Sequence, residues 1–308
     1  MFDIVGKRPW FFSGSLLLVV ACIVVLAVVG LKPGIDFTAG SITTLQFEQP
    51  VSAGQVQDEL FSLGFHAQVD STPSGNIVVH TVEMTPAEKD RMKHGLEAKF
   101  GPVEEKGFEN VNPVIARETA RIAGIAVAIA SVGILLYVTW AFRRMPRPFR
   151  YGTCAIIALL HDVVVVLGVF ALLGAALGWE VNLMFITGVL AVIGYSVNNT
   201  VVVFDRIREN LRKGVARTFE GTVNLSLVET MGRSLNTSLT TLFVVLALVL
   251  FVGVSIQNFA VVLLIGVVAG TYSSLFVAPN LLAAWESGRW WGSLSGRQPL
   301  LASRTQEG

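Results

Sequence analysis

Six apolar stretches recur along this chain of 308 residues and limit the folds that are open to it. They cover residues 11–31, 122–140, 151–173, 181–204, 235–252 and 259–284. A helix rises about 1.5 Å per residue, so about 20 apolar residues cross the core of a bilayer. Because 53% of the residues are hydrophobic and 15% are charged, we expect a polytopic membrane protein with six transmembrane helices. Stretch 11–31 is too long for the core of a signal peptide and no A-x-A-like site follows it, which favours an uncleaved anchor.

Lysine and arginine are distributed unevenly over the connections between these stretches. One side collects Lys7, Arg8, Arg143, Arg144, Arg147, Arg150, Arg206, Arg208, Arg212, Lys213, Arg217, Arg289, Arg297 and Arg304. The short connections 174–180 and 253–258 contain neither residue type. Cytoplasmic loops carry an excess of these cations, so we expect both termini in the cytoplasm. Segment 216–232 would then lie along the cytoplasmic surface.

Residues 34–112 have the composition of a soluble domain. Ser52 with Gln55 and Thr85 with Glu88 have the spacing of capping boxes, which predicts two helix starts. Alternation and turn residues predict strands at 42–48, 66–70, 76–82 and 103–110. The order strand, helix, strand, strand, helix, strand is that of a small ferredoxin-like α+β domain, placed outside the cell by the charge pattern.

Two adjacent amides, Asn198 and Asn199, lie about two helical turns before the charged end of the fourth stretch. At a spacing of seven residues, Asn198 shares a helix face with Asp205, and Asn199 shares one with Arg206. Polar side chains at membrane depth face a bundle interior or a water-filled path, which makes both amides functional candidates. The alternative is that they form interhelical hydrogen bonds worth about 0.6 kcal/mol each.

His161 and Asp162 lie near the middle of the third stretch. A lone charge costs at least about 2.5 kcal/mol at that depth, so both side chains are expected to face protein or water. Adjacent residues point in different directions on a helix and no third ligand is evident, so a zinc site is not expected. Cys22 and Cys154 lie inside apolar stretches. We expect both to pack as small hydrophobic residues.

A polar stripe begins the fifth stretch. Arg233 is followed at steps of three and four residues by Asn236, Thr237, Thr240 and Thr241. One interpretation is that this stripe, the two amides and Asp162 line a hydrated seam through the bundle. The other is that Arg233 extends to headgroups and the stripe makes ordinary helix contacts. In the sixth stretch, Gly266 and Gly270 form a G-x-x-x-G motif that indicates close helix packing.

Five motifs carry a resemblance to a known family. They are GIDFTAG at 34–40, HDVVV at 161–165, GYSVNNTVVVFDRIREN at 194–210, RSLNTSLTTL at 233–242 and GTYSSLFVA at 270–278. Their sequence and order resemble SecF, a membrane subunit of the bacterial SecDF complex that assists the Sec protein-export channel. The resemblance spans most of the chain and implies a multi-pass protein of the bacterial inner membrane.

The resemblance also implies roles for particular residues. Motif residues Gly34, Asp36, Phe37 and Gly40 would couple the external domain to the bundle, and Asp205 and Arg206 belong to the family motif. The motif arginine at Arg233 is associated with a proton path. At Asn199 the family has an aspartate that is a proton-relay candidate. The amide of Asn199 is then either an engineered substitution that blocks proton transfer or a natural change. In the second case the proton is carried by the partner subunit or by Asp162.

We therefore expect a SecF-like subunit that acts with a SecD-like partner and the subunits of the Sec channel. The resemblance implies that it uses the proton-motive force to promote late export of an unfolded polypeptide. The expected divisions are 1–33 with the first helix, 34–112 as the external domain, 113–286 as the remaining bundle and 287–308 as a cytoplasmic tail. Two alternatives are a proton-coupled small-molecule exporter of the resistance-nodulation-division type, whose external domains are much larger, and a structural scaffold subunit. No enzyme motif is found, so neither a cofactor, a metal nor nucleic acid is expected as a ligand.

Overall fold

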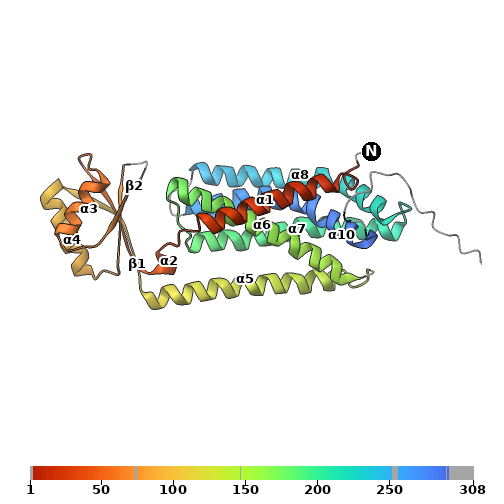
Figure 1. Cartoon of the computed structure of the whole chain (residues 1–308), viewed down its shortest axis with the longest axis horizontal. Helices are drawn as coiled ribbons and strands as arrows, with labels where there is room; N and C mark the ends of the chain where they lie inside the picture. The colour runs from red at the N-terminus through yellow and green to blue at the C-terminus, as the bar shows by residue number, and fades with distance from the viewer. Residues whose placement is uncertain (1–2, 73–74, 146, 252–255, 289, 291–308) are drawn as a thin grey trace, which may run out of the picture.

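Six long helices form a bundle, and a small α+β domain lies beyond one end of it (Figure 1). This computed structural model describes residues 3–72, 75–145, 147–251, 256–288 and 290. Within these ranges, the segments long and apolar enough to cross a membrane are α1 (Arg8–Val28), α5 (Pro113–Ala141), α6 (Pro148–Leu177), α7 (Leu183–Lys213), α8 (Phe219–Phe251) and Gln257–Ser287. The last consists of α9 (Gln257–Tyr272), a π-helical turn η2 (Ser273–Val277) and α10 (Ala278–Ser287). The predicted fold class is confirmed.

The α+β domain contains a four-stranded antiparallel sheet in the order β2-β3-β1-β4. Its strands are β1 (Gly40–Phe47), β2 (Gln68–Ser71), β3 (Ile77–Thr81) and β4 (Val103–Val111). Two helices, α3 (Ala53–Ser62) and α4 (Pro86–Phe100), cover the face of the sheet that points away from the bundle (Figure 1). The predicted ferredoxin-like order of elements is therefore present. Between the strands predicted at 66–70 and 76–82, positions 73 and 74 lie outside the described residues.

Both predicted capping boxes open the helices of this domain. The Ser52 hydroxyl accepts from the Gln55 amide at 3.3 Å, and the Thr85 hydroxyl accepts from the Glu88 amide at 3.4 Å. The returning hydrogen bond from the Thr85 backbone lowers the pKa of the Glu88 carboxyl. Met92 of α4 is fully buried in the domain core. Local capping and helical spacing thus account for these two helices.

Most of segment 216–232, predicted to lie along the membrane surface, belongs to a long helix. The helix α8 begins at Phe219 and continues without a break through the apolar stretch. Its first turns pack against the charged end of α7, where Asn210 Nδ2 donates to Ser226 Oγ at 3.0 Å and to Glu229 Oε2 at 2.7 Å. These polar contacts extend both helices beyond the apolar stretches.

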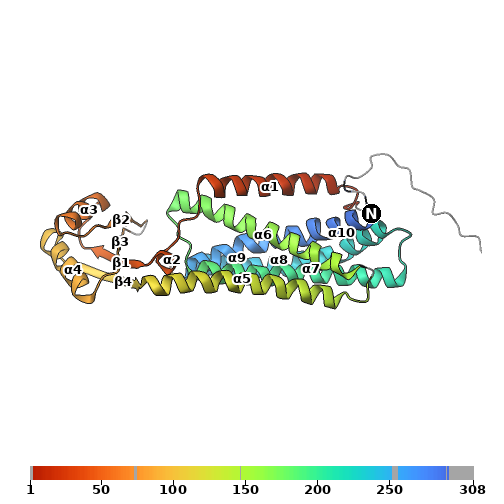
Figure 2. The same ribbon diagram turned by 60° about the horizontal axis from the view of Figure 1, so that its bottom comes forward.

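The helices of the bundle differ in how far they are buried. About half of the most apolar part of α6 and of α7 is buried, compared with 11% in α1 and in α5. Figure 2 shows α1 and α5 along opposite edges of the bundle. At the centre, α7 packs closely on α9, where a Cβ built on Gly270 would lie 3.1 Å from Ser196 Cβ. A Cβ built on Gly266 would likewise meet the side chain of Val192. Both glycines of α9 therefore permit the close approach of α7.

Candidate functional site

A short linker joins α1 to the α+β domain and is bonded to the connection between α6 and α7. The Gly34 amide donates to Val181 O at 2.8 Å, and the Val181 amide donates to Lys32 O at 2.7 Å. One carboxylate oxygen of Asp36 accepts from the Leu183 amide at 2.7 Å, which satisfies a free donor at the start of α7. The linker therefore touches the bundle at a helix N-terminus before it enters the sheet.

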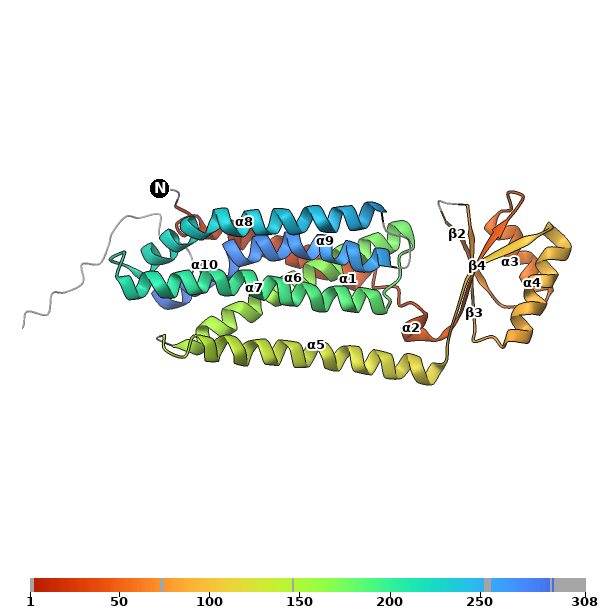
Figure 3. The ribbon, with the colours of Figure 1, turned by 180° about the vertical axis from the view of Figure 1, so that it is seen from behind.

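The linker contains a four-residue helix, α2 (Ile35–Thr38), between the sheet and the bundle (Figure 3). Phe37 packs against the core of the bundle. The helix ends at Ala39 with φ 68° and ψ 164°, followed by Gly40 with φ 128°. Both conformations favour glycine, so the backbone at Ala39 is strained.

A second contact joins the sheet to the same connection of the bundle. His80 Nδ1 of β3 lies 3.8 Å from Glu180 Oε1, and His80 Nε2 lies 3.8 Å from Asp70 Oδ2. Burial raises the pKa of the Glu180 carboxyl, although the nearby His80 and Lys32 act in the opposite direction. Asn258 Nδ2 donates to the backbone oxygen of Glu180 at 2.8 Å. Glu180 is thus in contact with both parts of the molecule.

A buried polar cluster lies inside the bundle around Asp162. The carboxylate is 1% exposed, and Oδ2 accepts from Ser196 Oγ of α7 at 2.5 Å and from Ser273 Oγ of η2 at 2.7 Å. Oδ1 lies 3.0 Å from His161 Nδ1. Three donors from three helical segments therefore converge on one carboxylate, which suits its ionised, acceptor-only form.

The two adjacent amides occupy different environments. Asn199 is 3% exposed, and its Nδ2 has no hydrogen-bond partner among the described residues, whereas Asn198 is exposed. Asn199 lies one turn beyond Ser196 on α7 and so extends the same buried face. Of the two amides, Asn199 faces the interior of this chain and Asn198 faces outward. Further along α7, Arg206 Nε donates to Glu229 Oε2 at 2.8 Å and Asp205 pairs with Arg208.

The polar stripe of α8 does not join the buried cluster. Arg233, Asn236, Thr237 and Thr240 are exposed, and Thr241 is half-buried. The Thr237 hydroxyl donates to Arg233 O at 2.9 Å, so it is satisfied within its own helix. The predicted single seam is therefore absent from the part of this chain that the structure describes, because the stripe and Asp162 face different directions.

The structure also places residues that the sequence reasoning did not single out. Ser196 and Ser273 complete the Asp162 cluster, and both stand inside motifs that already attracted notice, GYSVN and GTYSS. A hydroxyl in an apolar stretch is a weak signal because it usually bonds to its own backbone. The described residues contain no group of three histidine, cysteine, aspartate or glutamate side chains that could hold a metal ion. The titratable groups buried in the membrane segments near this point are His161 and Asp162.

The fold and the buried cluster define a six-span membrane protein whose α+β domain is bonded to a bundle with a polar centre. The family model described as "Protein export membrane protein SecD/SecF, C-terminal" matches residues 92–288, and the "SecD/SecF GG Motif" matches residues 24–51. The chain belongs to the SecD/SecF family. Relatives that it matches over nearly their entire length include proteins named protein translocase subunit SecF.

The relatives cover nearly the whole chain. The protein translocase subunit SecF of Thermobaculum terrenum is 43% identical over 93% of this chain and 95% of its own length. The subunit of the same name from Anaerolinea thermophila is 40% identical over 94% of this chain and 96% of its own length. A crystal structure of SecDF from Thermus thermophilus superposes with a TM-score of 0.81 and 32% identity. That match covers 93% of this chain but 39% of the SecDF chain, so this chain spans well under half of the solved protein.

Proposed function

We propose that this chain is the SecF-type subunit of a Sec-pathway export complex in a bacterial inner membrane. It acts with a SecD-like partner and the channel, and it uses the proton-motive force in late export of unfolded polypeptide. The named relatives are translocase subunits, which supports the pathway, and the charge distribution supports cytoplasmic termini and an external α+β domain. The chain performs no enzymatic reaction in this proposal.

The observation that carries the proposal is the bonded linker between the two parts of the molecule. Residues Lys32 to Asp36 hold the connection between α6 and α7 by two backbone hydrogen bonds and one carboxylate contact. A rearrangement around Asp162 of α6 and Ser196 of α7 can therefore be transmitted to the α+β domain through this connection.

The test compares export into membrane vesicles with and without a proton gradient, using the full chain together with copurifying subunits. Asp36→Ala removes the contact to α7, a helix N-terminal hydrogen bond worth about 1 kcal/mol. We expect the gradient-dependent part of export to fall about fivefold, since 1.4 kcal/mol corresponds to about tenfold. A SecD-like protein and channel subunits should copurify with both forms.

The matched control is Asp58→Ala, which removes an exposed carboxylate from α3 of the same domain. This variant should retain full gradient-dependent export. The proposed function is wrong if vesicles lacking the chain respond to the gradient as strongly as vesicles that contain it.

A further inference from the structure

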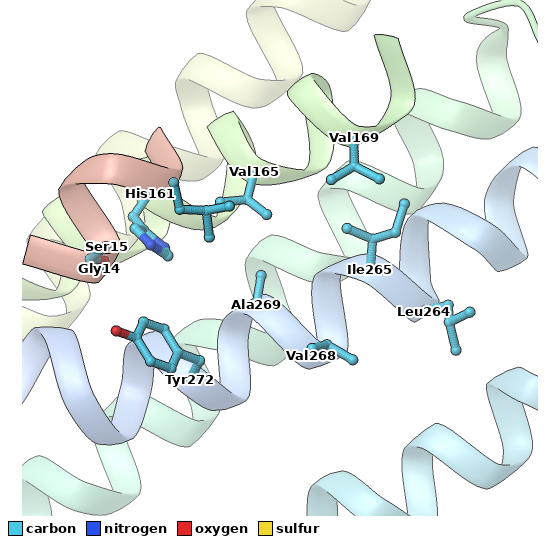
Figure 4. A pocket seen from close by; sticks show the side chains of 11 residues that line it. Gly14, Ser15, His161, Val165, Val169, Leu264, Ile265, Val268, Ala269 and Tyr272 are labelled. Carbon is cyan, nitrogen blue, oxygen red and sulfur yellow. The ribbon is translucent and has the colours of Figure 1, made fainter. Parts of the chain in front are cut away.

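A groove between α1, α6 and α9 lies inside the membrane-spanning part of the bundle and is almost wholly apolar. It has a volume of about 530 Å³, with Val165 and Val169 on α6 and Ile265 and Ala269 on α9 (Figure 4). Acyl chains are common to all phospholipids, so an apolar lining does not distinguish one phospholipid from another. Selection among lipids requires charged side chains at the level of the headgroups.

Three buried aromatic rings mark that level at the charged end of the bundle. Phe142 directly follows α5, Tyr151 lies in the first turn of α6, and Phe204 ends the apolar stretch of α7. The centroid of the Phe142 ring is 5.2 Å from that of Tyr151 and 5.9 Å from that of Phe204. Trp140, which is 61% exposed at the end of its apolar stretch, is typical of a membrane interface. Three apolar stretches therefore end at one depth, and the headgroups of this leaflet begin directly beyond it.

Three arginines on two neighbouring elements lie directly beyond the aromatic rings. They are Arg143, Arg144 and Arg208. The guanidinium carbon of Arg208 lies 5.7 Å from the centroid of the Phe142 ring, which places α7 against the loop between α5 and α6. Arg208 pairs with Asp205 of its own helix, whereas Arg143 and Arg144 form no ion pair within the described part of the chain. Cations therefore outnumber carboxylates in this group.

The other contacts of the loop hold it in place without neutralising this group. Arg147 and Arg150 lie 3.4 Å and 3.1 Å from the carboxylate of Glu286 on α10, so that carboxylate is already engaged. Arg143 Nη1 donates to Trp140 O at 3.2 Å, and its guanidinium lies 4.3 Å from the centroid of the Trp140 ring. Because these contacts already order the loop, a ligand that binds there loses less free energy to the ordering of side chains.

We propose that Arg143, Arg144 and Arg208 form a binding site for the phosphate of an anionic phospholipid in the leaflet at the charged end of the bundle. A guanidinium donates two parallel hydrogen bonds to a phosphate, and the aromatic rings place these guanidinium groups at the depth of the headgroups. An anionic headgroup such as phosphatidylglycerol complements the excess of positive charge. Phosphatidylcholine brings its own cation to the site and is therefore bound more weakly.

This site goes beyond the proposed function and requires only that the chain lies in a membrane. The same arginines also count toward the charge asymmetry that orients the chain. That asymmetry treats lysine and arginine alike and predicts no selection among headgroups. Headgroup selectivity and a preference for arginine over lysine are therefore the properties that distinguish a binding site from an orientation signal.

The first test is native mass spectrometry of the full chain released from micelles that contain equal amounts of phosphatidylglycerol and phosphatidylcholine with the same acyl chains. We expect the unaltered chain to retain phosphatidylglycerol preferentially. In the double variant Arg143→Gln/Arg144→Gln this preference should fall about 25-fold, about fivefold for each cation removed. The matched control is Arg117→Gln/Arg121→Gln, which removes the same charge from exposed positions at the other end of α5 and should keep the preference.

Two further variants separate binding from folding and geometry from charge. Asp205→Asn removes the exposed carboxylate beside Arg208 and should raise the association constant of phosphatidylglycerol about fivefold, a gain that misfolding does not produce. Arg143→Lys/Arg144→Lys keeps the charge but loses the planar fork, so its preference should lie between those of the unaltered chain and the glutamine variant.

Inorganic phosphate, compared with chloride at equal ionic strength, distinguishes a lipid from a free anion. We expect it to leave phosphatidylglycerol bound. Displacement by inorganic phosphate would show that the site binds a free anion, which overturns the lipid assignment. Equal retention of the two lipids by the unaltered chain, or an equal loss of preference in the glutamine variant and its control, would show that the arginines serve orientation alone.

Discussion

At the scale of single residues, Ala39 of the linker and Asn199 of α7 have different consequences for the molecule. Ala39 adopts φ 68° and ψ 164°, a conformation that is open to glycine and costly for other residues. Asn199 is buried with an unpartnered amide nitrogen. Ala39 stores backbone strain in the linker, and Asn199 supplies an amide, which does not titrate near neutral pH, to the buried face of α7.

The strain at Ala39 predicts that glycine stabilises the fold. Ala39→Gly should raise the free energy of unfolding by about 1 kcal/mol, the lower end of the cost of such a conformation. The melting temperature of the purified chain in detergent should rise by a few degrees, as about 1 kcal/mol does in chains of this size. A fall or no change would contradict the strain at this position.

The matched control for this experiment is an alanine in a helix. Ala98→Gly lies at an exposed position inside α4. Because glycine costs about 1 kcal/mol relative to alanine in a helix interior, this variant should melt at a lower temperature. The same substitution is therefore expected to act with opposite signs at the two positions.

At the scale of elements, the contact of β3 with the connection between α6 and α7 contains a carboxyl, that of Glu180, whose pKa is raised. Glu180 sits beneath the sheet beside His80, and burial raises the pKa of its carboxyl above the ordinary value of 4.5. An acid with a raised pKa in the docked state binds protons more readily there than when undocked. Docking of the α+β domain is consequently linked to protonation of Glu180.

The sign of this linkage predicts tighter docking at lower pH. The contribution of Glu180 to the free energy of docking is fully present below about pH 4.5. It is lost as the pH rises through the raised pKa that the carboxyl has in the docked state. Hydrogen exchange of the Gly34 and Val181 amides, corrected for intrinsic rates, should therefore slow as the pH falls through this window. Glu180→Gln should show the slow rate at every pH, because its side chain is always neutral.

His80→Gln provides a second check on the same element. The imidazole lowers the pKa of Glu180, so its removal should move the window to higher pH. Protection of the linker that is independent of pH in the unaltered chain, or a window that survives in Glu180→Gln, would show that Glu180 does not control docking.

At the scale of the whole molecule, the bundle separates a charged end from the end that carries the α+β domain. Arg8 pairs with Glu220 at 2.7 Å at one end, close to the extended parts of α7 and α8. The sheet and the linker lie at the other end (Figure 1). Cationic residues remain on the cytoplasmic side during insertion, so the charged end is expected to be cytoplasmic.

The orientation predicts which engineered thiols are accessible. In a chain with Cys22 and Cys154 replaced by alanine, Gln57→Cys should react with an impermeant thiol reagent applied to cells with an intact inner membrane. Val215→Cys, in the exposed connection between α7 and α8, should react only after the membrane is permeabilised. Labelling of Val215→Cys alone in intact cells would reverse the orientation.

Much of this architecture follows from local patterns in the sequence. The lengths of the apolar stretches predict six spans because the bilayer sets the length of a helix. The capping boxes at Ser52 and Thr85 predict two helix starts because their hydrogen bonds join residues three apart. Such patterns depend on neighbours in the chain, so they can be evaluated without knowing the fold.

Which polar residues meet depends on packing between segments that lie far apart in the chain. Asp162 bonds to Ser196 and Ser273, which are 34 and 111 residues away, whereas the stripe that begins at Arg233 faces outward. A helical pattern indicates that residues share a face, but packing between distant helices determines which neighbour that face contacts. The sequence by itself therefore determined the spans, the small domain and the candidate polar residues. The tertiary structure brought the two distant hydroxyls of Ser196 and Ser273 to the carboxylate beside His161, because burial of a charge requires more partners than the local sequence contains.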